Sequence, residues 1–295
     1  MAGEIVADWW ARAVLLDTFF VYASGLVAIG SALYGLLIAI PLQVPITVAQ
    51  RIGNIAASMA ILFVLLGVGI AGGNMLGDGV NALASPHTWS LAARTTLGLS
   101  AALGIVGMGL LILGFRMTAN KGRAVLAVGA TFGVGSFIVT GHAATATPVW
   151  LMAPVIAIHM TAAGFWLGAL PPLFSAAATM NGPQASTLMK RFSNWAAVAV
   201  TSLVLSGIVT TYIQVRSVTA LIETSYGHWL LFKLSAFVGL LLLAAGNKLY
   251  LTPRLESGRG RASVSMRRSI ALEIILFTFV VAAAAALAAV EPPRE

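Results

Sequence analysis

The chain has 295 residues, of which 59% are hydrophobic and only 9% charged, and its formal net charge is +8. A soluble globular domain has about a quarter of its residues charged, so this composition excludes an ordinary soluble fold. The lack of cysteine excludes disulfides, thiolate catalysis and iron–sulfur clusters, and no GxxxxGK[ST] motif for ATP binding is present. We therefore predict an all-α fold, a polytopic membrane helical bundle that forms a single domain over 1–295.

Eight apolar segments follow one another along the chain, each long enough to cross a bilayer as a helix. The breaks between them contain the glycine, proline and asparagine residues that are typical of turns. The predicted spans are roughly 14–40, 49–72, 91–114, 122–141, 148–174, 193–215, 229–250 and 268–290. An even number of crossings places both termini on the same side of the membrane.

Basic residues are distributed unevenly between the two sides that these spans define. Twelve of the 17 lysine and arginine residues fall on the side opposite the termini. Because cytoplasmic loops of membrane proteins carry an excess of Lys and Arg, we predict that this side is cytoplasmic and that both termini lie outside. The positive charge then reports topology, and no nucleic-acid partner is expected.

The fifth predicted span, 148–174, contains a histidine near its middle. His159 lies in a stretch, 124–189, that has no Asp, Glu, Lys or Arg. At 1.5 Å per residue, its side chain is about 16 Å from the outer end of the span. Met152, His159 and Trp166 are seven residues apart and therefore share one face of the helix, with Met160 beside them. Polar side chains within a membrane are costly and mark functional sites.

Imidazole and thioether groups together indicate copper. The thioether is soft and favours Cu(I), and imidazole binds both oxidation states of copper. We predict an entry site where His142 lies near Met152 at the outer end of the helices, and a deeper site at His159 with Met160 as a neighbouring candidate ligand. Trp166 is expected to line the path or to pack beside it.

Three further residues on the predicted outer side are weaker candidate ligands: Met75, His87 and His228. For the two histidines a structural role is preferred. His87 follows Ser85-Pro86, a sequence typical of a helix start.

Three charged residues lie at or inside the ends of predicted spans. Asp17 attracts a cation near the outer face or pairs with Arg94. Glu273 assists cation exit near the cytoplasmic face, or pairs with Arg267 or Lys248. Lys233 is expected to extend its ammonium group to the interface. The structural alternative is preferred for all three.

The block His159-Met-Thr-Ala-Ala-Gly-Phe-Trp166-Leu-Gly168-Ala-Leu resembles the H-x-x-A-A-x-x-W-x-G-x-L signature of the CopD copper-resistance family, and Gly141-His142-Ala143 resembles the GHA element of that family. Segments from Lys233 onward, including Arg268 to Glu273, resemble its last two spans. The resemblance implies a multi-pass protein of the bacterial inner membrane that is associated with copper uptake towards the cytoplasm. It also implies a separate periplasmic copper-binding partner of the CopC type.

Two functions of other classes remain open at this point. A b-type membrane cytochrome needs two histidines that face each other within the bundle, and only His159 is clearly in a span, so no haem is expected. A metal-free assembly scaffold would use the histidines structurally. Catalysis is not expected, because the chain has no carboxylate pair, no nucleophile–base arrangement and no phosphate-binding loop.

Overall fold

The computed structural model describes residues 2–77, 80–117, 119–141, 147–215, 218–258 and 261–290. All regular structure in these ranges is helical, which confirms the predicted all-α membrane bundle. In chain order the elements are α1 (Ala2–Tyr34), η1 (Gly35–Ala39), α2 (Thr47–Leu76), η2 (Val80–Ala84), α3 (Pro86–Ala93), α4 (Thr96–Arg116), α5 (Ala119–Ile138), α7 (Val149–Thr179), α8 (Gly182–Val215), α9 (Val218–Glu223), α10 (Ser225–Gly246), η3 (Asn247–Leu251), α11 (Thr252–Glu256) and α12 (Ala262–Ala289).

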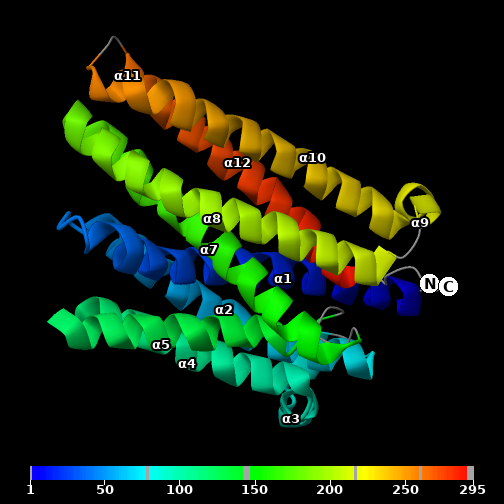
Figure 1. Cartoon of the computed structure of the whole chain (residues 1–295). Coiled ribbons are helices and arrows are strands. Elements are labelled where there is room, and N and C mark those ends of the chain that lie inside the picture. Colours follow the sequence, from blue (N-terminus) through cyan, green and yellow to red (C-terminus); the bar gives the residue numbers. More distant parts are fainter. Residues whose placement is uncertain are drawn as a thin grey trace.

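Seven helices of the described part are long and apolar enough to cross a membrane. They correspond to seven of the eight predicted spans. The remaining predicted span, 122–141, forms the helix α5, which packs along α4 (Figure 1). The first turns of α5 carry Asn120, Lys121 and Arg123, which lower its mean hydropathy. An eighth crossing therefore stays a prediction.

The helix α1 is central to the bundle and has two buried faces. Its residues Leu26 and Tyr34 belong to a hydrophobic core that includes side chains of α7, α8 and α12. Its residues Ala28, Ile29 and Ala32 belong to a second core with α2, α4 and α5. Figure 1 shows these two groups of helices on either side of α1. A helix that is apolar all round is suited to this position, because no side of it faces water.

The ends of the helices separate into two sets. The start of α1 and the end of α12 lie at one end of the bundle, where the short helices α3 and α9 also lie (Figure 1). The opposite end holds the start of α8, the helix α11 and the start of α12. This second end carries many of the basic residues assigned to the cytoplasm, among them Lys190, Arg191, Arg254, Arg267 and Arg268.

The helices α1 and α7 cross with their backbones in contact. A Cβ atom on Gly168 would lie 2.4 Å from the backbone carbon of Gly30, and one on Gly30 would lie 1.7 Å from the carbonyl oxygen of Gly164. No side chain fits in this space. Gly164 and Gly168 thus permit close helix packing, and the contact fixes α7 against the central helix.

The end of α1 shows how a free carbonyl is satisfied within the bundle. Pro41 has no N–H, so it cannot donate to the carbonyl four residues earlier, at Leu37. The π-helix η1 covers this region, and Arg191 of α8 donates from Nε to the Leu37 oxygen at 2.9 Å. This bond joins α8 to α1 and positions the face of α8 that meets α7.

Candidate functional site

The face of α7 that carries Met152, His159 and Trp166, called the stripe below, lies within the bundle. Met152 and Trp166 are fully buried, and His159 between them is half-buried. Met160, next to His159, packs against the larger core. The three residues share a face because of the helical period. This face is buried because Gly164 and Gly168 hold α7 against α1.

His159 has a hydrogen-bond partner on the neighbouring helix. Its Nδ1 lies 2.9 Å from Oγ of Ser206 on α8. The Ser206 hydroxyl is also 2.6 Å from the carbonyl oxygen of Ser202. A hydroxyl has one proton, and this proton is used in the bond to the Ser202 carbonyl. Ser206 therefore accepts from Nδ1–H of His159, and neutral His159 keeps a free lone pair on Nε2.

The Ser206 bond gives His159 the form that a metal ligand needs. Histidines that bind metals usually donate their other ring N–H to a fixed acceptor, which sets the tautomer and the ring orientation. The sequence did not reveal Ser206, because 47 residues separate the two side chains. A serine inside the apolar span 193–215 was the only available signal.

A lysine side chain lies near His159. Lys233 of α10 is half-buried and lies within electrostatic range of the imidazole. The sequence predicted only that Lys233 would extend towards the membrane interface. Its proximity to His159 depends on how α10 packs, which the spacing along the chain does not specify.

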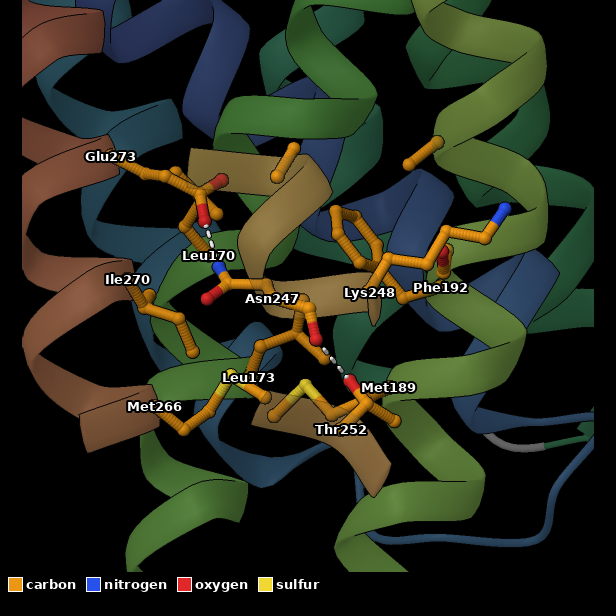
Figure 2. Close-up of a pocket in the computed structure, with 13 residues that line it drawn as sticks. Leu170, Leu173, Met189, Phe192, Asn247, Lys248, Thr252, Met266, Ile270 and Glu273 are labelled. Carbon is orange, nitrogen blue, oxygen red and sulfur yellow. Dashed lines mark hydrogen bonds between the residues drawn. The ribbon is translucent and has the colours of Figure 1, made fainter. Parts of the chain in front are cut away.

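A second polar group lies deeper in the bundle, at Trp166. The indole Nε1 donates to Oε2 of Glu273 on α12 at 3.1 Å. Asn247 Nδ2 donates to the other carboxyl oxygen, Oε1, at 2.5 Å. Glu273 is only 2% exposed. The three side chains come from α7, η3 and α12, so this hydrogen-bonded triad joins three parts of the chain; Figure 2 shows the bond between Asn247 and Glu273.

The structure corrects the predicted partners of Glu273. The alternatives were Arg267 and Lys248, and both are wrong, because the carboxyl group is bonded to Trp166 and Asn247 instead. Arg267 lies over the ring of Phe174, with its guanidinium carbon 4.6 Å from the ring centroid. A buried carboxyl group next to two uncharged donors avoids burying a second full charge.

Aromatic rings enclose the indole of Trp166. The ring centroids of Phe237 and Phe277 lie 6.4 Å and 5.5 Å from that of Trp166, both in edge-on arrangements. These contacts fix the indole in the orientation that directs Nε1 at Glu273. They also make this level of the bundle a tightly packed aromatic barrier below His159.

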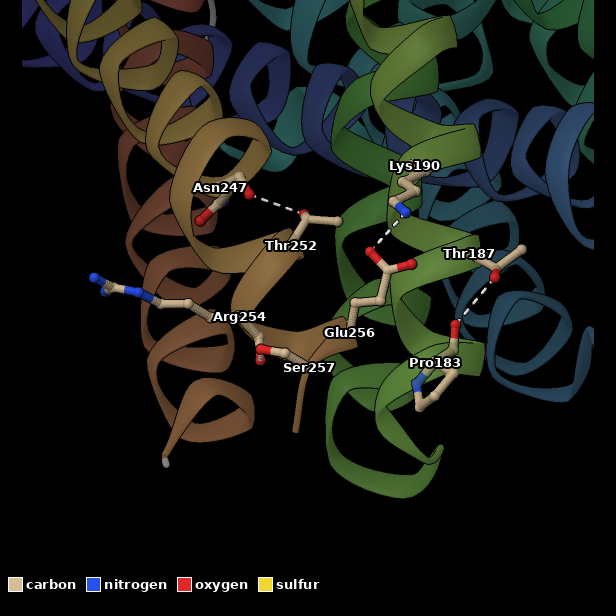
Figure 3. Close-up of polar contacts among 8 residues, drawn as sticks. All are labelled: Pro183, Thr187, Lys190, Asn247, Thr252, Arg254, Glu256 and Ser257. Atoms are coloured by element: carbon tan, nitrogen blue, oxygen red, sulfur yellow. Dashed lines mark hydrogen bonds and ion pairs between the residues drawn. The ribbon is translucent and has the colours of Figure 1, made fainter. Parts of the chain in front are cut away.

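Asn247 is a site residue that the sequence analysis missed. It begins the π-helix η3, and its carbonyl accepts from Thr252 Oγ1 at 2.8 Å. π-Helical turns inside α-helices are frequent at functional sites. The available signal was a single asparagine in an apolar span, six residues before Pro253. Figure 3 shows the Thr252 bond and the nearby ion pair of Lys190 with Glu256, which ties α11 to α8.

The other predicted ligands are not gathered at His159. His142 lies outside the described residues. His87 is exposed in α3, and Met75 is 52% exposed near the end of α2. His228 is exposed, and its Nε2 lies 2.6 Å from the Ile222 carbonyl oxygen. Within the part of the chain that the structure describes, no group of three or more His, Cys, Asp or Glu side chains forms a metal site.

Asp17 is the remaining candidate on the path. Its carboxyl group lies against α2, where a Cβ on Gly67 would be 2.4 Å from Oδ2. Oδ1 is buried and accepts no hydrogen bond from the described residues. The alternative pairing of Asp17 with Arg94 stays a prediction. Asp17 is held at the α1–α2 contact.

Comparison with known proteins identifies the second half of the chain. Residues 186–287 match the family described as CopD, copper resistance protein D. This part of the chain is similar to the CopD family. The CopD match runs from α8 to α12 and thus includes Ser206, Lys233, Asn247 and Glu273, but not α7.

Two curated relatives are similar to parts of this chain. The copper transport protein CutJ of Bacillus subtilis (strain 168) is 31% identical over 126 residues, which are 41% of this chain and 23% of CutJ. Copper resistance protein D of Pseudomonas syringae pv. tomato is 33% identical over 150 residues, which are 47% of this chain and 48% of the relative. The matches thus span about half or less of these relatives. No solved structure matches the chain.

Proposed function

We propose that this protein binds copper and carries it across the bacterial inner membrane, from the periplasm to the cytoplasm, without ATP hydrolysis. The proposal depends on His159, which lies inside a membrane-spanning helix and has Nδ1 bonded to Ser206, leaving Nε2 free. The names of the two CopD relatives, which refer to copper transport and copper resistance, support copper as the transported ion.

The buried stripe of α7 supplies the route. Met152 lies about 10 Å from His159 along the helix, towards the outer end. Trp166 lies about 10 Å from His159 in the opposite direction. Thioether sulfur and imidazole nitrogen are ligands for copper that need no charged partner. Copper enters at the level of Met152, with His142 as an additional entry ligand, and binds next at His159. Met160 lies beside this second position.

Two charged side chains favour inward movement. Lys233 lies within electrostatic range of His159, and in its protonated form it disfavours long residence of a cation at the imidazole. Glu273 lies one step deeper, and its negative charge attracts a cation there. To reach the Glu273 level, copper has to pass the packed indole of Trp166. We therefore propose that movement of Trp166 away from Glu273 opens the path.

The proposed surroundings follow from the similarity to the CopD family and from the charge distribution. The end with the basic loops faces the cytoplasm, and the end with both termini faces the periplasm. A periplasmic copper-binding protein of the CopC type would deliver the ion to the outer end. The bilayer contacts the outer faces of the helices, and no nucleic acid takes part.

The first test is copper uptake by purified protein in liposomes that contain a copper-sensitive dye. We expect the wild type to load the dye and His159→Ala to lose this activity. His228→Ala is the matched control, because His228 is exposed and bonded to a backbone carbonyl. The control should transport like the wild type. Equal transport by His159→Ala and the wild type would contradict the role of His159.

Metal content and an absorption spectrum of the same samples separate the other functions. Bound copper that falls in His159→Ala supports the proposal. A strong Soret band would replace it with a b-type cytochrome. Protein that contains neither copper nor haem after copper loading would be a metal-free scaffold.

A further inference from the structure

A small cavity lies between α8, η3 and α12 on the basic-loop side of Glu273. It has a volume of about 40 Å³, and its lining includes Met189, Met266, Asn247 and Glu273. One water needs about 10–15 Å³ of such space, so the cavity admits one or a few waters or a dehydrated monovalent ion.

Two methionines from different helices meet in this cavity. Met189 on α8 is 5% exposed and Met266 on α12 is 1% exposed. Figure 2 shows both sulfur atoms directed into the space between the two side chains. A pair of facing thioethers is a soft donor set, and soft sulfur ligands select Cu(I) over the hard cations of the cell.

The helical period connects this pair to the path along α7. The helices α7 and α12 are antiparallel neighbours, and Trp166 on α7 meets Glu273 on α12. Leu173 lies seven residues after Trp166 on α7, and Met266 lies seven residues before Glu273 on α12. Both of these residues line the cavity. The methionine pair therefore continues the stripe, about 21 Å along α7 from His159.

Oxygen donors lie on the side of the cavity that faces Glu273. Asn247 lines the cavity, and its Oδ1 is buried with no hydrogen-bond partner among the described residues. A buried amide oxygen without a partner is costly, and a cation or an ordered water would satisfy it. Lys248 also lines the cavity, but Figure 2 shows its ammonium group directed away from the two sulfurs.

We propose that Met189 and Met266 form an inner binding site for a soft monovalent cation, Cu(I), from which the ion leaves towards the cytoplasm. This inference deepens the proposed function and rests on it. The ion would be held by the two thioethers, with Asn247 Oδ1 as the nearest oxygen donor and the Glu273 carboxyl group supplying negative charge. The ordinary role of buried methionine is to fill space in a core, and the experiment separates the two roles.

The experiment measures Cu(I) bound per chain, and the copper X-ray absorption spectrum, for the full-length protein in detergent. The variants are Met189→Leu, Met266→Leu and the double variant, which keep apolar volume close to the original. Met108→Leu is the matched control, because Met108 is equally buried in the other core and lines no part of the cavity. Each variant is also checked for its melting temperature.

We expect the double variant to lose one Cu(I) per chain and to show weaker copper–sulfur scattering, while Met108→Leu matches the wild type. His159→Ala should keep the sulfur-bound copper. A second measurement needs no variant: protein labelled with selenomethionine should show copper–selenium scattering, and Ag(I), a soft cation of the same charge, should compete for the site.

The outcomes distinguish this inference from the proposed function. If the double variant binds as much Cu(I) as the wild type with unchanged sulfur scattering, while His159→Ala reduces transport, the methionines only pack and the inner site is overturned alone. If the wild type binds no Cu(I), both proposals are overturned. Loss of copper confined to the cavity variants, at an unchanged melting temperature, supports the inner site.

Discussion

Replacement of Ser206 by alanine tests the central argument about His159. Ser206 accepts from Nδ1 at 2.9 Å and donates to the Ser202 carbonyl at 2.6 Å. The Ala variant removes this acceptor without touching the imidazole. The Nδ1–H group is then left without a partner in apolar surroundings, or the ring rotates or changes tautomer. In either case Nε2 is less available to copper.

The expected loss follows from two independent magnitudes. A donor left unsatisfied in a buried place costs about 1–3 kcal/mol. Removal of the hydrogen-bond partner of a metal-binding histidine lowers metal affinity about 10–100-fold, which corresponds to about 1.4–2.7 kcal/mol. We therefore expect Cu(I) affinity at the His159 site to fall about 10–100-fold in Ser206→Ala.

The assay is competition for Cu(I) against a chromophoric chelator, with Ser202→Ala as the matched control. Ser202 lies one turn earlier on α8, and its contribution to the chain of bonds is its backbone carbonyl, which alanine retains. The control should bind like the wild type. Nitrogen NMR of labelled histidine gives a readout that does not depend on copper, since it reports which ring nitrogen of His159 carries the proton.

Two results would refute the reasoning. One is a Ser206→Ala variant with wild-type affinity and an unchanged tautomer. The other is an equal loss of affinity in Ser206→Ala and Ser202→Ala, which would mean that the effect comes from α8 packing and not from the bond to His159.

Three further predictions concern stability in detergent. Trp166→Phe removes the donor to Glu273 Oε2 and should lower the free energy of unfolding by about 1–3 kcal/mol. Gly168→Ala places a Cβ 2.4 Å from the Gly30 backbone, so α1 and α7 must separate, at a cost of about 1–3 kcal/mol. Lys190→Ala breaks an ion pair whose side chains are 55% and 51% exposed, and stability should change by about 1 kcal/mol at most.

Thermal or denaturant unfolding measures all three, and each has its own comparison. Trp229→Phe, at an exposed tryptophan, should leave the free energy of unfolding nearly unchanged. A loss of stability equal to that of Trp166→Phe would contradict the stabilising role of the bond between Trp166 and Glu273. Gly207→Ala meets nothing within 4 Å, so it should be neutral or stabilising by about 0.5–1 kcal/mol. A Gly168→Ala variant as stable as Gly207→Ala would contradict the close crossing. A large loss in Lys190→Ala would show that α11 depends on this ion pair.

The stripe on α7 shows how far periodicity reaches. The seven-residue spacing of Met152, His159 and Trp166 placed them correctly on one buried face, because helix geometry is local. For Glu273 the predicted partners were wrong. The prediction named basic residues, whereas the structure provides Trp166 and Asn247, which lie 107 and 26 residues away.

The π-helix η3 accounts for a second prediction that was wrong. Proline at 41 and at 253 indicated breaks between spans; the helix does end at Ala39, before Pro41, but at Pro253 the chain continues in helical form from η3 into α11. The Leu37 carbonyl, which Pro41 cannot serve as a donor, accepts from Arg191 Nε of another helix, and no local pattern predicts such a donor.

The sequence by itself determined the membrane class, the length and apolar character of the helices and the uneven distribution of basic residues. These depend on composition and on the local helical period. Only the tertiary structure decided which side chains come together: His159 with Ser206, Trp166 with Glu273, and Met189 with Met266 in the lining of one cavity. In a bilayer these pairs depend on which helix faces approach one another, and close approach is set by steric contacts such as Gly30 against Gly168 rather than by any spacing along one segment.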